Sequence, residues 1–302
     1  MEDDQVTPGA VPLVSIGLPV YNGSETLSAV LDSLLAQSLT DFEIIISDNG
    51  SSDGSAKMCE EYLALDSRVR YFPQPKNIGA VANFKFVLEQ ARAPYFLWAA
   101  SDDVRTPDFL SANVGFLEEN LEYVASTSPN CFEGQDPDGA NLITFSIAAP
   151  TAHERFQQFF EHCWKSHGIF YSVIRTAVLR QCEFVGQSFI AADWAIDLFL
   201  ASHGSIHRSD KGLTIFGAYG ISSRSGSYRA FRNQFIEILL PFYRLSRIVL
   251  QMSKDFPRLH KWEIWKILVK LNMGALWNQA HSALYQFYCR HLKYKNSSGN
   301  LK

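Results

Sequence analysis

Four short apolar runs in the first hundred residues each end in a polar or glycine-bearing loop, and this alternation constrains the fold most. Helical patterns separate the runs, which predicts a mainly parallel sheet covered by helices. Ligands of open α/β sheets bind at the carboxyl ends of the strands, so we expect the functional site in these loops. The predicted strands are 13–20, 43–47, 69–72 and 95–99; the helices are 25–37, 55–65 and 79–91; the loops are 21–24, 48–54, 73–79 and 101–106.

The α/β pattern continues beyond Pro107, and the whole of 1–227 is predicted to form one α/β domain. From Tyr228 the patterns are helical only, interrupted by Pro241 and Pro257, which predicts a helical region over 228–302. The further predicted segments are helices over 107–120, 152–165, 194–203, 231–252 and 259–271, extended runs over 123–127, 169–174 and 212–216, and a surface loop over 130–141.

Composition indicates a globular chain in a reducing compartment. The 302 residues are 47% hydrophobic, which is ample for a packed core. The five cysteines are odd in number and include no C-x-x-C pair, which argues against a disulfide framework or a structural zinc site. Residues 1–4 are acidic where a secretory signal is basic, so we expect a cytoplasmic protein.

Charge is unevenly distributed along the chain. Residues 228–302 hold thirteen Lys and Arg against three acidic residues, a balance of +10, so the rest of a chain of net charge −4 carries −14. Such a region is either a solvated helical face or a surface for an anionic partner. The face predicted to contact anionic membrane consists of Trp262, Trp265, Leu268, Val269 and Asn272, with charge from Lys261, Lys266 and Lys270. The stretch 271–289 is too polar to span a membrane.

The loop after the first strand reads Pro19-Val20-Tyr21-Asn22-Gly23. Asn22 is well placed as a helix N-cap, with Glu25 as its capping-box partner. The alternative to a simple cap is that the aromatic face of Tyr21 stacks on a nucleobase.

The second loop places Asp48 at the end of an apolar strand, followed by serines and glycines up to Gly54. A carboxylate there can accept the imino N–H of a pyrimidine, and free backbone N–H groups can bind ribose or phosphates. An Asx-rich turn that begins the next helix is the alternative, and it accounts well for Asp53.

The third loop contains the adjacent acids Asp102 and Asp103 directly after an apolar strand. Paired carboxylates repel each other unless a cation neutralises them, and Mg²⁺ or Mn²⁺ bound to a diphosphate does so. The alternatives are that Asp103 caps the helix near Pro107 or that both side chains face water.

These three loops, in this order and spacing, resemble those of the family 2 glycosyltransferases, inverting enzymes with the GT-A fold. The resemblance covers about 11–226. It implies that Pro19, Tyr21 and Asp48 hold the nucleoside and that Asp103 contacts the metal through the donor diphosphate. We also expect Asn22, Asn77 and Asp102 to bind the nucleotide sugar. The family's Asp-x-Asp-Asp element has Ala100 in its first place here.

Three further segments are similar to family elements. Asn77-Ile78-Gly79 is similar to an Asn-x-Gly segment, although a helix N-terminus explains it equally well. Asp193, after Ala192 where Glu is common, corresponds to the catalytic base; its alternatives are a helix N-cap or replacement by Asp197 one turn on. Arg224 lies in a segment that either closes over the diphosphate or is a linker.

The resemblance implies an inverting transfer from a nucleotide sugar, preferably a UDP-sugar, with Mn²⁺ or Mg²⁺ as cofactor. The expected acceptor is a hydroxyl of a glycan or lipid-linked molecule in cell-surface polysaccharide biosynthesis, at the inner face of the membrane. We expect no nucleic-acid partner, and the oligomeric state stays open. The alternatives are a sugar-nucleotide pyrophosphorylase, which the single glycine and lack of basic residues in 19–24 disfavour, and a non-catalytic donor-binding or membrane scaffold protein.

Overall fold

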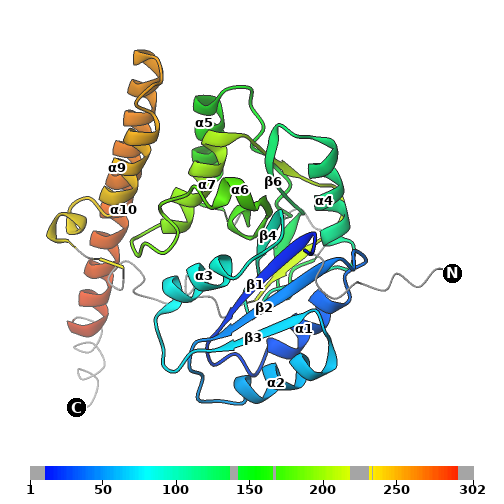
Figure 1. Cartoon of the computed structure of the whole chain (residues 1–302). Coiled ribbons are helices and arrows are strands. Elements are labelled where there is room, and N and C mark those ends of the chain that lie inside the picture. The colour runs from blue at the N-terminus through cyan, green and yellow to red at the C-terminus, as the bar shows by residue number, and fades with distance from the viewer. Residues whose placement is uncertain (1–10, 137–141, 166–167, 218–230, 233, 292–302) are drawn as a thin grey trace, which may run out of the picture. The chain divides into compact units, whose positions relative to one another are not determined.

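The computed structural model in Figure 1 describes residues 11–136, 142–165, 168–217, 231–232 and 234–291, with side chains to residue 281. The chain divides into two compact units: Met1–Ser188 with Ala192–Ser225, and Phe189–Ala191 with Gly226–Lys302. The first unit has an α/β architecture, and the second unit is helical.

A seven-stranded sheet forms the centre of the first unit, in the order β3-β2-β1-β4-β8-β6-β9. All neighbouring pairs are parallel except the two that involve β8, which is antiparallel to β4 and β6. The prediction of a mainly parallel sheet is therefore confirmed. The strands are β1 Val14–Val20, β2 Phe42–Asp48, β3 Val69–Pro73, β4 Tyr95–Trp98, β6 Tyr123–Thr127, β8 Val173–Arg175 and β9 Ser205–Arg208.

Helices cover both faces of this sheet, as Figure 1 shows for α1 and α2 on one face and α3 on the other. Alternate residues of β1 explain the layers, because Val14, Ile16 and Leu18 belong to the core cluster that includes α1. On the opposite face, a Cβ at Gly17 would lie 2.7 Å from atoms of Val87 and Phe96, so only glycine permits this packing. The helices are α1 Leu27–Leu35, α2 Ser55–Leu65, α3 Ala80–Glu89, α4 Phe109–Glu119, α5 Ala152–His162, α6 Thr176–Leu179 and α7 Ala192–His203.

A small second sheet, in the order β5-β10-β7, joins distant parts of the first unit. Its strands are β5 Val104–Arg105, β7 Asn130–Phe132 and β10 Thr214–Phe216. β10 pairs antiparallel with β5 and parallel with β7. This sheet fixes the loop after β4 to the segment that ends at Gly217.

Several segments differ from the sequence prediction, and three of them concern the sheets. The segment 130–141, predicted as a loop, begins with β7 because its backbone pairs with β10. The run 169–174, predicted as extended, begins as the 3₁₀ turn η1 Ile169–Tyr171, since Gly168 before it has a left-handed φ of 64°. β9 was not predicted, because it is an extended segment through its backbone pairing with β6.

A buried charge network joins the starts of β1, β2 and β3. The Glu43 carboxylate accepts hydrogen bonds from Arg70 Nη1 at 2.8 Å, Arg92 Nη2 at 2.7 Å and Ser15 Oγ at 2.7 Å. Burial alone would raise the pKa of Glu43, but these bonds and the charge of Arg70 hold the pKa below its ordinary value. A charge this deeply buried is tolerated because it is fully paired.

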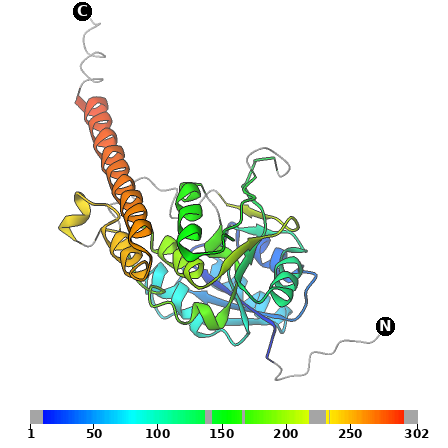
Figure 2. The same ribbon diagram turned by 90° about the horizontal axis from the view of Figure 1, so that it is seen from above.

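The second unit consists of η3 Phe235–Ile238, α9 Tyr243–Met252 and the long α10 Arg258–His291. α9 and α10 lie side by side in Figures 1 and 2. Asn272 joins them, because its Oδ1 accepts from Phe242 N at 2.9 Å and its Nδ2 donates to Ser246 Oγ at 3.0 Å. Among the described residues, no helix is both long enough and apolar enough to cross a membrane.

The predicted membrane face of α10 is partly wrong. Leu268 and Asn272 are buried, so they belong to the packed side of the helix, not to an exposed face with Trp262 and Trp265. The prediction failed because α10 carries apolar residues on more than one side. The sequence alone does not say which side is packed and which is exposed.

Candidate active site

The first two loops are joined by hydrogen bonds through Asn22. Its backbone N–H donates to Ser51 Oγ at 2.9 Å, and its Oδ1 accepts from Ser52 N at 2.8 Å. Asn22 has a left-handed φ of 51°, a conformation that Asn tolerates better than most residues. The predicted N-cap role of Asn22 is wrong, because α1 begins later, after Thr26, and the Asn22 side chain is used between the loops.

Asp53 completes the joint between these loops. Its carboxylate accepts from Ser24 N at 3.1 Å and from Ser55 N at 2.9 Å. Desolvation opposes ionisation, yet the bonds from Ser55 and Ser24 lower the pKa of Asp53 to about 2. The turn that we considered as an alternative for Asp53 is therefore present, and it connects both loops.

The residues expected to hold the nucleoside lie at the carboxyl ends of β1 and β2. Pro19 is buried within β1, whereas Tyr21 just beyond it is half exposed and presents its ring to solvent. Asp48 is buried at the end of β2, where its Oδ1 accepts from Ser51 N at 3.0 Å and its Oδ2 accepts from Tyr71 Oη at 3.4 Å.

Asn77 connects the loop after β3 to the loop after β2. Its Oδ1 accepts from Asn49 Nδ2 at 3.2 Å and from Gly79 N at 2.8 Å, directly before α3 begins at Ala80. Gly50 has a φ of 71°, and a Cβ there would lie 2.9 Å from the carbonyl carbon of Lys76. The loops after β1, β2 and β3 are thus packed against one another at the carboxyl edge of the sheet.

Asp103 is only 4% exposed, so the alternative that its side chain faces water is wrong. It also caps no helix, since its Oδ1 accepts from Gly217 N at 3.2 Å. Burial raises the pKa of Asp103 to about 6; the Arg105 charge and the Gly217 N–H oppose the rise, and the Asp102 charge adds to it. A carboxylate held at this cost is expected where a cation binds.

Asp102 is half-buried beside Gly217. A Cβ at Gly217 would lie 2.5 Å from the Asp102 carbonyl oxygen and 2.8 Å from its Cγ, so a larger residue there displaces Asp102. The same loop is tied to the first one by the Thr26 hydroxyl, which donates to Ser101 O at 2.6 Å.

Sequence reasoning missed Arg105, a buried arginine two residues after Asp103. Its guanidinium lies over the Phe109 ring at 5.3 Å and donates to Trp98 O at 3.4 Å. Within the described structure, its Nε and Nη1 have no hydrogen-bond partner. Burial lowers the pKa of Arg105, while the charges of Asp103 and Tyr171 raise it. A basic residue two positions after a pair of adjacent acids was the signal available in the sequence.

Tyr171 was also missed, because its run was predicted as a strand. Burial and the negative charges of Asp103, Asp193 and Asp102 raise the pKa of the Tyr171 phenol, and Arg105 lowers it. Asp193 in α7 and the two acids after β4 therefore act on one phenol, although about ninety positions separate them in the sequence.

Asp193 is the second residue of α7, in its first turn. It is therefore not the N-cap, and Ala191, two residues before it, has a left-handed φ of 62°. The Asp193 side chain is solvent-accessible. Desolvation by the surrounding protein nevertheless raises its pKa, and hydrogen bonds from the backbone N–H groups of Trp194 and of Asp193 itself oppose that rise. Asp197 is fully buried, and burial together with the Asp193 charge raises its pKa well above the ordinary value.

Arg224, which the resemblance places over the diphosphate or in a linker, lies outside the described residues.

Comparison with known sequences identifies the family. The sequence model of "Glycosyl transferase family 2" matches residues 15–181, which is more than half of the chain. The chain belongs to glycosyl transferase family 2.

Curated relatives match this family 2 chain over part of its length. The chondroitin synthase of Escherichia coli is 38% identical over 135 residues, covering 44% of this chain and 19% of that protein. The putative glycosyltransferase EpsE of Bacillus subtilis is 29% identical over 134 residues, covering 44% of this chain and 48% of that protein. The chain thus spans less than half of the length of these relatives.

Solved structures share the GT-A fold. Residues 1–349 of S. aureus TarS in complex with UDP-GlcNAc match with a TM-score of 0.61 and 19% identity, covering 83% of this chain and 70% of that chain. The mannosyltransferase PcManGT of Pyrobaculum calidifontis, in complex with GDP-Man and Mn²⁺, matches with a TM-score of 0.54 and 14% identity, covering 94% of this chain and 77% of that chain.

The donor set of this family 2 site fits a hard divalent cation. Asp102 and Asp103 supply carboxylate oxygens, which Mg²⁺ and Mn²⁺ prefer. In the part of the chain that is described, no group of three or more His, Cys, Asp or Glu side chains could hold a metal ion by itself. One or two carboxylates completed by substrate phosphates and water are the usual magnesium arrangement, and this site offers that arrangement.

Proposed function

We propose that the protein is an inverting, metal-dependent glycosyltransferase that moves a sugar from a nucleotide-sugar donor to an acceptor hydroxyl. The observation that carries the proposal is the set of hydrogen-bonded loops at the carboxyl edge of the sheet, which hold Asp48 after β2 and Asp102 and Asp103 after β4. The charges of Asp102, Asp103 and Asp193 all raise the pKa of Tyr171, which supports placing Asp193 near these loops. Two acids suited to a cation and one accessible acid suited to a base lie beside a loop system that can hold a nucleotide.

In the proposed reaction, the acceptor hydroxyl gives its proton to the Asp193 carboxylate while its oxygen forms a bond to the anomeric carbon. The bond from that carbon to the diphosphate breaks on the opposite side, and the nucleoside diphosphate leaves with the electron pair. Configuration inverts because this is a single displacement. The raised pKa of Asp193 makes it a stronger base than an ordinary carboxylate.

A cation bound at Asp103 and Asp102 supplies charge stabilisation for the leaving diphosphate. We propose Mn²⁺ or Mg²⁺ for this role, and the Mn²⁺ in the PcManGT complex supports the choice. Arg224, in the segment after Gly217, is proposed as an additional partner of the diphosphate.

We propose a UDP-sugar as the donor. The Asp48 carboxylate, at the end of β2, would accept the imino N–H of uracil, and the exposed ring of Tyr21 would stack on the base. Pro19, Asn22 and Asn77 would shape the loops around the nucleoside. The complex of TarS with UDP-GlcNAc supports this choice.

The acceptor is proposed to be a glycan or lipid-linked hydroxyl in cell-surface polysaccharide biosynthesis. The similarity to a chondroitin synthase over 44% of this chain supports a polysaccharide role. We further propose that residues 1–227 are the catalytic domain, and that the basic region 228–302 brings it to anionic membrane on the cytoplasmic side.

Transfer of radiolabelled sugar from UDP-, GDP- and dTDP-sugars, with Mn²⁺, Mg²⁺ or EDTA, tests the proposal. We expect transfer from a UDP-sugar that EDTA abolishes and Mn²⁺ restores. Synthesis of a nucleotide sugar from a nucleoside triphosphate and a sugar 1-phosphate would instead identify a pyrophosphorylase. Metal-dependent UDP binding with neither transfer nor donor hydrolysis would identify a non-catalytic binding protein.

A further inference from the structure

An exposed apolar stripe runs along α10 in the second unit. Its members recur every three or four residues, which places them on one face of the helix. Over this length a helix rises roughly 27 Å at about 1.5 Å per residue. The stripe consists of Leu259, Trp262, Trp265, Val269, Met273 and Trp277, which are 41% to 73% exposed.

The stripe is separate from the face of α10 that is buried. Ile264, Leu268, Leu271 and Ala275 are all almost fully buried, and their positions lie on the other side of the helix from the stripe. α10 therefore has one covered apolar face and one exposed apolar face. A contiguous exposed patch of this size marks an interaction surface.

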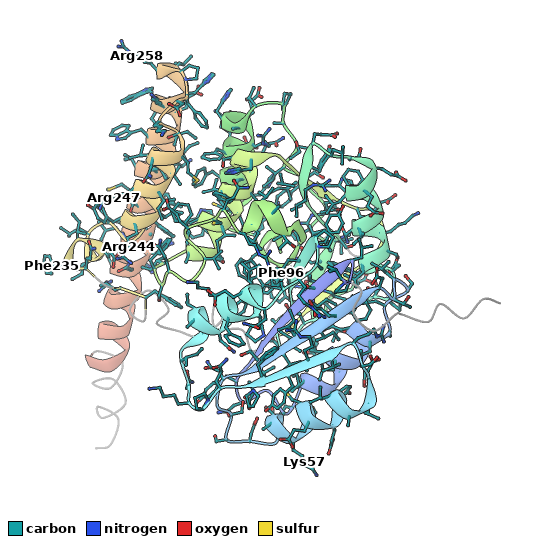
Figure 3. All side chains as sticks on the ribbon, viewed as in Figure 1. Lys57, Phe96, Phe235, Arg244, Arg247 and Arg258 are labelled. Atoms are coloured by element: carbon teal, nitrogen blue, oxygen red, sulfur yellow. The ribbon has the colours of Figure 1, made fainter. Side chains whose placement is uncertain are left out.

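Positive charge borders the stripe. At 100° per residue, Lys266 and Lys270 fall along one edge and Lys261 along the other. Between Arg258 and His281 the sequence contains four basic residues and the single acid Glu263. Figure 3 labels Arg258 at one end of the helix pair and Arg244 and Arg247 farther along it. Arg247 adds to the positive charge of this unit, whereas Arg244 lies 3.8 Å from the Glu237 carboxylate, which offsets its charge.

A shallow hollow of about 380 Å³ lies where the stripe meets the basic residues. It is lined by Leu250, Arg258, Lys261, Trp262 and Trp265. The two indoles are stacked, with centroids 4.7 Å apart and planes at 12°. Two cations beside two indoles can bind a phosphate while the rings contact the first part of an acyl chain, as interfacial tryptophans do.

We propose that the α10 stripe is the surface by which the protein docks on an anionic phospholipid membrane, with the helix lying in the plane of the interface. This deepens the membrane contact included in the proposed function, but it does not depend on catalysis. A second copy of the chain is a poor occupant, because its own stripe would bring the same positive charge. Anionic lipid supplies both the apolar layer and the opposite charge.

Co-sedimentation of the full-length protein with vesicles tests this docking surface. We expect binding to vesicles of phosphatidylcholine mixed with phosphatidylglycerol, little binding to phosphatidylcholine alone, and release by salt. The variant Lys266→Gln/Lys270→Gln should bind about 25-fold more weakly, because each basic residue contributes about a factor of five. Inorganic phosphate at moderate concentration should not displace the protein from the vesicles.

A second variant, Trp262→Gln/Trp265→Gln, removes the apolar contact and should weaken vesicle binding at least about tenfold, since each indole loses most of its buried area. Leu65→Gln/Leu121→Gln is the matched control, because both leucines are exposed and belong to the first unit. Hydrolysis of the nucleotide sugar without vesicles should stay unchanged in all variants, which separates loss of docking from loss of catalysis or folding.

Equal recovery of the wild-type protein with neutral and anionic vesicles would overturn the proposal. It would also be overturned if the lysine variant and the tryptophan variant both bound anionic vesicles as tightly as the wild type does. A dimer in size-exclusion chromatography that the tryptophan variant dissociates, with no vesicle binding, would assign the stripe to a second copy of the chain instead.

Discussion

Replacing Asp103 by Asn should make the protein more stable at alkaline pH while it destroys metal-dependent donor binding. The folded pKa of Asp103 is about 6, against an ordinary value of 3.8, chiefly because burial disfavours the charged form. For an acid whose folded pKa is raised, stability falls as pH rises from about 4 to about 6 and stays low above that. A pKa difference of about 2 corresponds to about 3 kcal/mol, which Asn restores because it is neutral at every pH.

Thermal unfolding in EDTA, at pH 8 and at pH 4.5, measures this difference. At pH 8 the melting temperature of Asp103→Asn should exceed that of wild type by about 6 to 12 °C, since about 1 kcal/mol corresponds to about 2 to 4 °C for a domain of this size. At pH 4.5 most of the gain should disappear. With Mn²⁺ and UDP present, the wild type should be stabilised by ligand binding and the variant should not.

Asp108→Asn provides the control of opposite sign. Hydrogen bonds from the Thr106 hydroxyl and the Gly212 N–H lower the pKa of Asp108, and desolvation opposes this only in part. The ionised form of Asp108 therefore stabilises the fold. This variant should melt at or slightly below the wild-type temperature at pH 8. A lower melting temperature for Asp103→Asn than for wild type at pH 8 would refute the argument that Asp103 is held ionised at a cost.

Three further variants test the site and its support. Asp193→Asn should lower kcat by about two orders of magnitude without lowering the melting temperature, because the pKa of Asp193 is raised and loss of its charge does not destabilise the fold. More than about a tenth of wild-type kcat, with chemistry rate-limiting, would reject Asp193 as the base. Gly217→Ala should displace Asp102 and so weaken Mn²⁺-dependent UDP binding about tenfold or more, as measured by calorimetry. Gly115→Ala is the control and should leave UDP binding unchanged, because nothing lies within 4 Å of a Cβ at that position. Glu43→Gln should destabilise the protein by about 1 to 3 kcal/mol in urea unfolding at pH 7, because it removes the negative charge that pairs with the partly exposed Arg70 and Arg92. Because the pKa of Glu43 is lowered, this difference should shrink as pH falls below about 4.

The first half of the fold was predictable because local signals and tertiary structure agree there. β1 to β4 and α1 to α3 formed within two residues of their predicted ends, since each apolar run is bounded by turn residues. Asp48, Asp102 and Asp103 were also recognisable, because a carboxylate directly after a buried strand is conspicuous in sequence. No local pattern predicted β9 or β7, because their extended backbone depends on partners far away in the chain.

The environment of the site was not predictable for a related reason. That Asp103 is buried follows from the backbone of Gly217, more than a hundred residues away. The place of Tyr171 beside the acids follows from the antiparallel course of β8, which brings η1 to the carboxyl end of the sheet. Sequence periodicity carries no information on such long-range juxtapositions, so residue types were recognised while their surroundings were missed.

The antiparallel strand β8 also has a consequence for the order of events during synthesis. It lies between β4 and β6, so residues 173–175 fill the centre of a sheet whose first strands were made long before. Until that segment leaves the ribosome, β4 is an edge strand with unpaired backbone groups and apolar side chains. Nascent chains that end between β6 and β8 should therefore be the aggregation-prone stage of biogenesis, and a chaperone that binds extended apolar segments should be most effective during that interval.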